Sequence, residues 1–205
     1  MRFLITAGPT REHLDPVRFL SNRSSGKMGY ALAEVARAHG PVTLVSGPVN
    51  LPVPTGVEFV PVVSAAEMAE AVFRRYAEAD VVIMAAAVCD FRPKHVATHK
   101  RKKETMERML ELEPTPDILA ELGRRKTRQV LVGFALETEN VEASAAEKLR
   151  RKHLDWIVAN EARALDAAAN AVTIIGADGT RERLPERPKR DVAVAIVERV
   201  LPRRR

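Results

Sequence analysis

A short segment rich in hydroxyl groups and glycine is the first candidate for chemistry. The residues Ser24-Ser25-Gly26-Lys27-Met28-Gly29 begin a stretch in which apolar residues recur at helical spacing. The unpaired amide N–H groups and the positive dipole end of such a helix start attract anions. A helix cap with glycines for close packing explains the same residues equally well. The long polar insertion before the segment favours a binding site.

Two single polar residues stand near the same kind of position. Asn22 lies just before the helix start, where an asparagine is usually a turn residue, although beside a phosphate its amide would hold a carbonyl or a developing oxyanion. Asp90 lies two residues beyond the apolar run 81–88. Its carboxylate would bind Mg²⁺ or pair with a neighbouring base if a ligand docks there, and otherwise it only forms a turn.

Basic residues gather in two further places. Six Arg or Lys residues without an acidic neighbour stand within residues 92–103. Such a run repels itself and is easier to tolerate when a multiply charged anion binds. Its lysines would then neutralise charge in phosphoryl or nucleotidyl transfer, whereas a solvated loop is the alternative. Lys148 and Lys152 face the same way on an expected helix, which indicates a solvated surface or a pair that binds phosphates.

Several common sites are excluded by the spacing. A dinucleotide-binding dehydrogenase needs G-x-G-x-x-G between its first strand and helix, and a P-loop needs Ser or Thr where Met28 stands. The five histidines lack metal-ligand spacing. The single cysteine, Cys89, excludes an internal disulfide and a cysteine metal cluster, and we expect it to pack at a strand end.

The elements that must position these residues alternate between apolar runs and helical patterns. This alternation predicts an α/β fold, a Rossmann-like doubly wound, mostly parallel sheet with helices on both faces. Strands are expected at residues 3–7, 42–45, 57–60, 81–88, 129–135, 155–159 and 171–175, with an edge strand at 105–112. Helices are expected at residues 26–39, 65–78, 116–123, 141–152 and 189–200. Ser64 and Glu67 form a capping box, and the turn 177–180 predicts a hairpin. Ligands of such sheets bind beyond the carboxyl ends of the strands.

The composition bounds the class of protein. The chain has 205 residues, of which 46% are hydrophobic and 29% charged, so we expect a single domain over residues 1–205. No run approaches the roughly 18 apolar residues of a membrane span, and the N-terminus does not resemble a signal peptide, which predicts a cytoplasmic protein. Of the net charge of +6, residues 181–205 hold nine basic and four acidic side chains. With only 4% aromatic residues, no nucleic-acid partner is expected.

The motifs, taken in order, resemble those of one enzyme family. The segments 5–12 and 15–29 are similar to the N-terminal signature of bacterial phosphopantothenoylcysteine synthetase, the phosphopantothenate–cysteine ligase of coenzyme A biosynthesis. The likeness continues through residues 43–48, 85–93, 100–103, 116–119, 132–138 and 158–160. It therefore spans nearly the whole chain.

The resemblance implies a two-step ligation that uses CTP and Mg²⁺. The carboxylate of 4′-phosphopantothenate attacks the α-phosphate of CTP, which gives an acyl-cytidylate and pyrophosphate. The amine of L-cysteine then attacks the acyl carbon and releases CMP. The choice of CTP over ATP comes from the resemblance, since no residue proves it. The alternatives are an NAD(P)-binding Rossmann oxidoreductase, which lacks its fingerprint here, and a non-catalytic nucleotide-binding domain.

The resemblance also assigns roles at the matching positions. Asn22 would position the acyl-cytidylate, and Lys100 would stabilise charge while it forms. The substrate phosphate would lie against Gly8, Ser24, Gly26 and Gly29. The nucleotide would contact Met84, Ala85, Ala86, Asp90, Lys100, Pro116, Asp117, Ile118, Leu119, Phe134, Lys148 and Lys152. Asp90 is also the candidate ligand of the metal.

Family members are homodimers whose site is completed across the interface by an extended segment, which matches residues 94–113 here. Bacterial relatives are commonly fused to an N-terminal flavin-dependent decarboxylase, which this chain lacks, so no FMN is expected. The chain is then a free-standing synthetase or an excised domain, and a separate decarboxylase partner stays an open alternative. Three residues depart from the family pattern: Cys89 replaces alanine, Arg101 an apolar residue and Thr115 asparagine.

Overall fold

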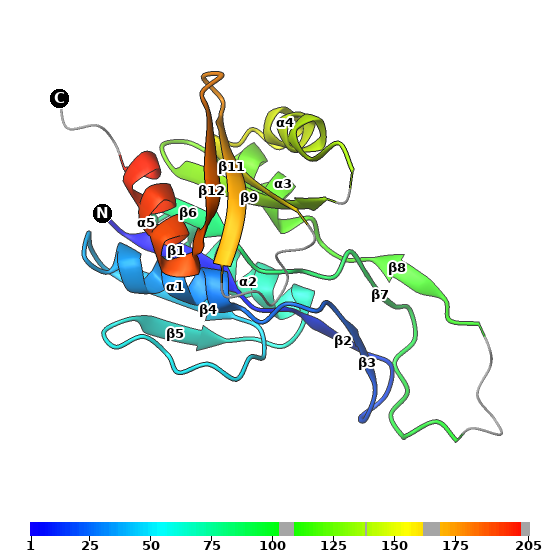
Figure 1. Cartoon of the computed structure of the whole chain (residues 1–205). Helices are drawn as coiled ribbons and strands as arrows, with labels where there is room; N and C mark the ends of the chain where they lie inside the picture. The colour runs from blue at the N-terminus through cyan, green and yellow to red at the C-terminus, as the bar shows by residue number, and fades with distance from the viewer. Residues whose placement is uncertain (103–108, 138, 162–168, 202–205) are drawn as a thin grey trace.

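One central sheet organises the computed structural model of the chain, which describes residues 1–102, 109–137, 139–161 and 169–201 (Figure 1). Its strands lie in the order β5-β4-β1-β6-β9-β10-β11-β12. They are β1 (Phe3–Ala7), β4 (Val42–Ser46), β5 (Glu58–Pro61), β6 (Val81–Met84), β9 (Val130–Glu137), β10 (Trp156–Glu161), β11 (Ala169–Gly176) and β12 (Arg181–Pro188). The neighbours from β5 to β10 are parallel, and β11 and β12 add as an antiparallel hairpin. The predicted doubly wound, mostly parallel sheet and its late hairpin are confirmed.

Helices cover both faces of the sheet, as predicted. They are α1 (Lys27–Ala36), α2 (Ala65–Tyr76), α3 (Ile118–Arg125), α4 (Val141–Arg151) and α5 (Lys189–Val200). The buried side chains of α1 and α5 join one apolar core, and those of α2, α3 and α4 join the core on the opposite face. None of these described helices combines the length and apolar character that crossing a membrane requires.

The helix starts differ in how their N–H groups are capped. At α2, Ser64 Oγ accepts a hydrogen bond from the Glu67 N–H at 3.2 Å, and Glu67 Oε2 accepts from the Val63 N–H at 2.8 Å. The predicted Ser64–Glu67 cap is confirmed, although the Glu67 carboxylate accepts from the N–H of Val63, the residue before the cap, rather than from the N–H of Ser64. By contrast, α1 begins after Gly26, whose φ of 75° is left-handed, and no side chain caps it. The first N–H groups of α1 are therefore open to a ligand.

Most element boundaries differ from the expected ones by one to three residues, and two of the differences have a visible local reason. The strand expected to reach residue 88 ends at Met84, because the Ala86 N–H donates to the side-chain Oγ1 of Thr6 at 3.1 Å rather than to a backbone carbonyl group. Pairing with the chain after β1 resumes only as a single bridge between Pro9 and Ala87. The helix expected to end at Gly123 continues to Arg125. A Cβ on Gly123 would lie 2.0 Å from the Lys152 carbonyl oxygen, so this glycine permits close packing.

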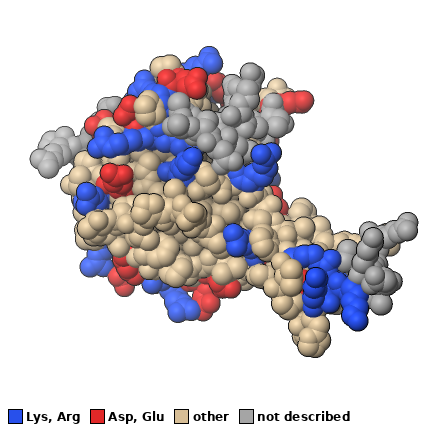
Figure 2. All heavy atoms as spheres, turned by 60° about the horizontal axis from the view of Figure 1, so that its bottom comes forward, with Lys and Arg blue, Asp and Glu red and all other residues tan. Residues whose placement is uncertain are grey.

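Two short ribbons project from the sheet (Figure 1). One pairs β2 (Arg11–His13) with β3 (Phe19–Ser21), and the other pairs β7 (Phe91–Pro93) with β8 (Leu112–Pro114). The edge strand expected at residues 105–112 is wrong where it can be checked, since β8 starts at Leu112 and pairs only with β7; residues 103–108 lie outside the described part. We call residues 91–114 the arm. Basic side chains gather on it (Figure 2).

Candidate active site

A cavity of about 350 Å³ opens at the carboxyl edge of the sheet. The start of α1, the loop after β6 and the carboxyl ends of β9 and β10 line it, at the side where ligands of doubly wound sheets bind. Residues predicted for the site that line this carboxyl-edge cavity are Asn22, Ser24, Gly26, Gly29, Ala85, Ala86, Asp90, Phe134 and Lys148. Segments more than a hundred residues apart in the sequence thus meet in one pocket.

The glycines of the α1 start are required by the backbone. Gly26 has a φ of 75°, and a Cβ on Gly29 would lie 2.5 Å from the Ala7 Cβ. Ser24 Oγ accepts a long hydrogen bond of 3.4 Å from the Gly26 N–H. The left-handed φ therefore explains Gly26, and close packing of α1 on β1 explains Gly29. The uncapped start of α1 lines the cavity. Gly8, with a φ of 72°, lies in the loop after β1 and does not line the cavity.

Asn22 is tied to the loop after β6 rather than to its own turn. Its Nδ2 donates a hydrogen bond to the Ala87 carbonyl oxygen at 3.0 Å and approaches Cys89 Sγ at 3.8 Å. The amide is thereby fixed at the mouth of the cavity. Cys89 itself is buried, and burial raises the pKa of its thiol. Cys89 is buried as expected, but it lies in the loop five residues beyond the end of β6, where it contacts Thr10.

One wall of the cavity carries a lysine and a carboxylate. Lys148 reaches from α4 to donate a hydrogen bond to the Phe134 carbonyl oxygen on β9 at 2.8 Å. Asp90 is exposed, and no hydrogen bond or ion pair to another described residue occupies its carboxylate. Within the described ranges, no three His, Cys, Asp or Glu side chains cluster to hold a metal. Asp90 fits Mg²⁺ only in the manner common for nucleotides, in which phosphate oxygens supply further ligands.

Other predicted nucleotide contacts lie beside the cavity and do not line it. Met84 of β6 and Ile118 and Leu119 of α3 are buried in the apolar core that α2 and α3 cover. Asp117, after Pro116, caps α3 by accepting from the Ala120 N–H at 3.0 Å, and accepts from Lys152 Nζ at 2.8 Å. Desolvation opposes ionisation of Asp117, but these two donors outweigh it and hold its pKa below the ordinary value. Lys152 and Lys148 therefore serve different partners.

Lys100 lies on the arm, exposed, and does not line the cavity of its own chain. The buried carboxylate of Asp15 fixes the backbone at Arg101, the residue after Lys100. Asp15 accepts hydrogen bonds from the Arg18 guanidinium at 2.6 Å and from the Arg101 N–H at 3.3 Å, while Arg18 donates to the Arg101 carbonyl oxygen at 3.0 Å. The Arg18 guanidinium holds the pKa of Asp15 far below its usual range.

Sequence reasoning missed several residues of this region. Asp15 and Arg18 stood only inside a motif, and no spacing rule links them to residue 101, which lies 86 positions further on. The cavity is also lined by Asn160, Asn170 and Lys189. Asn160 had a detectable signal, because it is a polar residue at the carboxyl end of a buried strand, but Asn170 and Lys189 had none.

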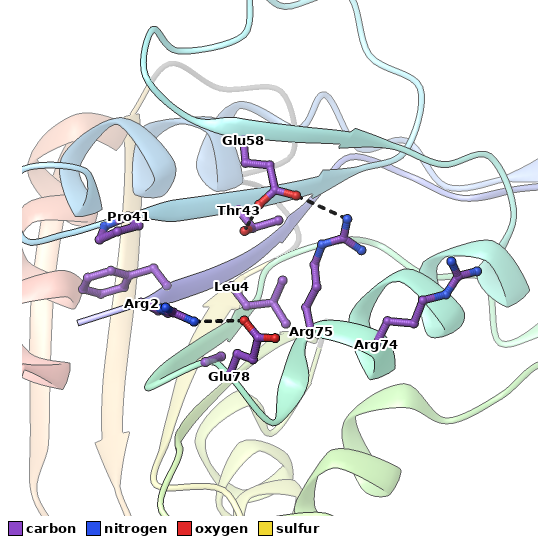
Figure 3. Close-up of a pocket in the computed structure, with 10 residues that line it drawn as sticks. Arg2, Leu4, Pro41, Thr43, Glu58, Arg74, Arg75 and Glu78 are labelled. Atoms are coloured by element: carbon purple, nitrogen blue, oxygen red, sulfur yellow. Dashed lines mark hydrogen bonds and ion pairs between the residues drawn. The ribbon is translucent and has the colours of Figure 1, made fainter.

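A larger hollow of about 590 Å³ lies at the amino ends of β1, β4 and β5 (Figure 3). Its charged side chains are paired within the chain: Arg2 with Glu78 at 2.9 Å and Arg75 with Glu58 at 3.3 Å. Thr43 Oγ1 also donates to Glu58, at 2.8 Å. No predicted site residue lines this amino-edge hollow, and its charged side chains all have partners within the chain, Arg74 pairing with Glu70 of α2.

The chain is similar to known proteins over nearly its whole length. The family model described as the DNA/pantothenate metabolism flavoprotein C-terminal domain matches residues 1–203. Over 203 residues the chain is 52% identical to the coenzyme A biosynthesis bifunctional protein CoaBC of Bacillus subtilis. That match covers 96% of this chain and 50% of the relative, so the chain spans about half the length of the curated relatives it matches.

Two solved structures extend the comparison. The crystal structure of the C-terminal domain of the coenzyme A biosynthesis bifunctional protein CoaBC superposes with a TM-score of 0.85 at 50% identity, covering 97% of this chain and 93% of that one. A Cab2 variant in complex with phosphopantothenate-cysteine superposes with a TM-score of 0.78 at 18% identity, covering 98% and 87% of the two chains. The second likeness is one of fold alone.

Proposed function

The chain belongs to the family of the DNA/pantothenate metabolism flavoprotein C-terminal domain, and we propose that it joins 4′-phosphopantothenate to L-cysteine at the expense of CTP. The close relative in coenzyme A biosynthesis supports this substrate class. The observation that carries the proposal is the carboxyl-edge cavity, where a fixed amide, an uncapped helix start and a lysine converge. No observation favours an oxidoreductase.

The proposed reaction needs two successive displacements. A carboxylate is a poor acyl donor, so its oxygen first forms a bond to the α-phosphorus of CTP while the bond to pyrophosphate breaks. The cysteine amine then forms the amide bond to the acyl carbon, CMP leaves with the bonding electrons, and the amine gives up a proton. Negative charge on phosphate oxygens rises in the first step and on the acyl oxygen in the second.

The cavity residues match these demands. The free N–H groups of α1 and the Lys148 ammonium favour phosphate oxygens. The Asn22 amide, held by the Ala87 carbonyl oxygen, is placed to orient the acyl-cytidylate for the amine. Asp90 would hold Mg²⁺ together with phosphate oxygens, and the ion would neutralise phosphate charge.

Lys100 is brought to the reaction by a second copy of the chain in this proposal. The arm and the neighbouring β2–β3 ribbon expose large apolar side chains that a monomer would leave in water: Val17, Phe19, Phe91, Val96, Met109, Leu110 and Leu112. Exposed apolar surface of this kind is typical of interaction sites. A homodimer that covers it would let the arm of one subunit reach the carboxyl-edge cavity of the other.

Pyrophosphate release tests the proposed function directly. Protein mixed with CTP, Mg²⁺ and 4′-phosphopantothenate, without cysteine, is expected to release a burst of about one pyrophosphate per site, as a trapped intermediate requires. Adding L-cysteine should convert the burst into steady turnover. Absence of pyrophosphate with CTP and with ATP alike would overturn the ligase proposal.

Location and further partners stay predictions. The sequence alone supports a cytoplasmic location and a separate decarboxylase as an open alternative partner. It also predicts that the chain binds no FMN, no nucleic acid and no membrane.

A further inference from the structure

A second hollow, of about 650 Å³, adjoins the carboxyl-edge cavity. The two share one wall, because the same four residues line both: Asn22, Ser24, Ser25 and Lys27. The rest of its lining comes from Pro9, from the β2–β3 ribbon and from the loop after β4. We call it the ribbon hollow. A molecule bound in it would share the Asn22 wall with a substrate bound in the carboxyl-edge cavity.

The ribbon hollow carries basic side chains without acidic ones. Arg11 and Lys27 line it, and no Asp or Glu stands among the described residues of its lining. No hydrogen bond or ion pair to another described residue occupies the Arg11 guanidinium or the Lys27 ammonium. By contrast, Arg2 and Arg75 of the amino-edge hollow are both paired with glutamates. The positive charge of the ribbon hollow is therefore available to an anion.

An aromatic ring orients the Arg11 guanidinium. Its Cζ lies 4.6 Å from the centroid of the Phe19 ring, on the strand β3 that pairs with β2. The backbone N–H of Arg11 donates to the Val63 carbonyl oxygen at 2.8 Å, which fixes the start of the ribbon. Stacking on a ring leaves the N–H groups at the edge of a guanidinium free. Two of these N–H groups match the two oxygens of a carboxylate.

We propose that the ribbon hollow binds the carboxylate of the substrate L-cysteine through Arg11, with Lys27 adding to the attraction. The inference rests on the proposed function and gives its second substrate a place. The cysteine amine must reach an acyl carbon held beside Asn22, and the amine and carboxylate of an α-amino acid are attached to the same carbon atom. A carboxylate bound at Arg11 would thus bring the amine toward the shared wall.

Phosphate groups are the alternative anions for the ribbon hollow. The free N–H groups of α1 and the Lys148 ammonium already favour phosphate oxygens in the carboxyl-edge cavity. The two phosphorylated substrates therefore have their donors there, and the ribbon hollow is left for the second substrate.

Cysteamine, which is cysteine without the carboxylate, tests the proposal together with Arg11→Gln. Wild type should use L-cysteine with a kcat/KM at least about tenfold above that for cysteamine, because only L-cysteine forms charge-assisted hydrogen bonds with Arg11. Arg11→Gln should lower kcat/KM for L-cysteine by about tenfold or more, mainly through KM. Its kcat/KM for cysteamine and its pyrophosphate burst without amine should stay at wild-type values.

Two further variants sharpen the test. Arg11→Lys keeps the charge without the planar fork, so its preference for L-cysteine should lie between those of wild type and Arg11→Gln. Arg74→Gln makes the same chemical change at the amino edge and is the matched control, which should keep the wild-type preference.

Three outcomes would overturn the proposal. Equal use of the two amines by wild type would do so without any variant having to fold. So would an Arg11→Gln variant that keeps the wild-type preference for L-cysteine. A smaller burst, or an equal loss with both amines, would mean that Arg11 serves the phosphate chemistry or only the fold. Failure of the ligase proposal is distinguishable, because wild type would then release no pyrophosphate from CTP or ATP, and this inference would fall with it.

Discussion

The two edges of the sheet carry hollows of opposite character. The amino-edge hollow, about 590 Å³, is larger than the carboxyl-edge cavity of about 350 Å³, yet its Arg2 and Arg75 side chains are paired with Glu78 and Glu58 (Figure 3). The ribbon hollow of about 650 Å³, lined by Asn22 and Ser24, adjoins the start of α1 at the carboxyl edge. The carboxyl-edge cavity holds the unpaired amides of Asn160 and Asn170 and an uncapped helix start. Unused hydrogen-bonding capacity, rather than volume, distinguishes the candidate active site.

The difference has an energetic reason. Leaving a buried polar group unpaired costs about 1–3 kcal/mol, so a protein that keeps several of them at one place has not been optimised there for its own stability. The exposed ion pairs of the amino edge carry no such cost, because water solvates the charged groups that the partner side chain leaves uncovered. A bound ligand that hydrogen-bonds to these unpaired groups would therefore stabilise the protein more at the carboxyl edge than at the amino edge.

The largest expected effects come from two substitutions at the proposed site. Lys100→Gln and Asn22→Asp should each reduce turnover by about 100-fold or more, as loss of one charge-stabilising group does. Lys100→Gln should suppress the pyrophosphate burst, because no ammonium group then stabilises the negative charge that develops on phosphate oxygens in the first step. Asn22→Asp should keep the burst and fail with cysteine. The readout is burst amplitude beside steady turnover, and identical early blocks in both variants would refute this division of roles.

Mixing the two inactive variants asks whether Lys100 acts across a dimer. If a site combines one subunit's cavity with the other's arm, a mixed dimer has one intact site and one doubly defective site. Random exchange of equal amounts in a two-fold dimer should then restore about a quarter of wild-type turnover. Native mass spectrometry of the mixture verifies the exchange. Restored activity near zero in exchanged dimers would mean that Lys100 serves its own chain or no site.

Local sequence signals predicted the sheet and much of the cavity. The apolar runs, the Ser64 cap and the late hairpin depend on nearby residues, and α5 spans the residues expected of it. The cavity residues at the α1 start and after β6 were predictable because motifs placed them at a helix start and beyond the end of an apolar strand.

Contacts that join distant segments were not predictable. The strand that begins at residue 81 stops at Met84 because the Ala86 N–H bonds to the Thr6 side chain, 80 positions earlier in the sequence. Gly123 lies inside a helix rather than at its end, and its missing Cβ makes room for the Lys152 carbonyl group. Likewise, Asn170 reaches the cavity only because β11 pairs with β10 in the folded chain. A secondary-structure propensity depends on the residues of one segment, whereas these boundaries and contacts depend on segments that are distant in the sequence.

The ion pair between buried Asp15 and partly exposed Arg18, beside the arm, should give a pH-dependent effect of intermediate size. The Asp15 side chain is fully buried and its pKa is held below the ordinary value by Arg18. The ionised form therefore stabilises the fold above the ordinary pKa of about 3.9, and this stabilisation is lost as the pH falls toward the folded pKa. Asp15→Asn should unfold at lower denaturant concentration at pH 7, and its difference from wild type should shrink below about pH 4.

Denaturant titrations between pH 7 and pH 2.5 measure that gap. Turnover of Asp15→Asn should also fall, because Asp15 fixes the Arg101 backbone next to Lys100. A gap that stays constant across the range would mean that the Asp15 charge does not contribute, and that only its shape does.

The smallest effect is expected at the amino edge. The Arg2 and Glu78 side chains are 62% and 75% exposed, so their 2.9 Å pair should contribute less than about 1 kcal/mol to the free energy of unfolding. Salt at 1 M should remove most of that contribution. Glu78→Gln should also leave turnover within about twofold of wild type, since surface changes away from a site rarely matter. A loss of turnover as large as that of Asn22→Asp would show that the amino-edge hollow takes part in the reaction, and the contrast between the two edges would then fail.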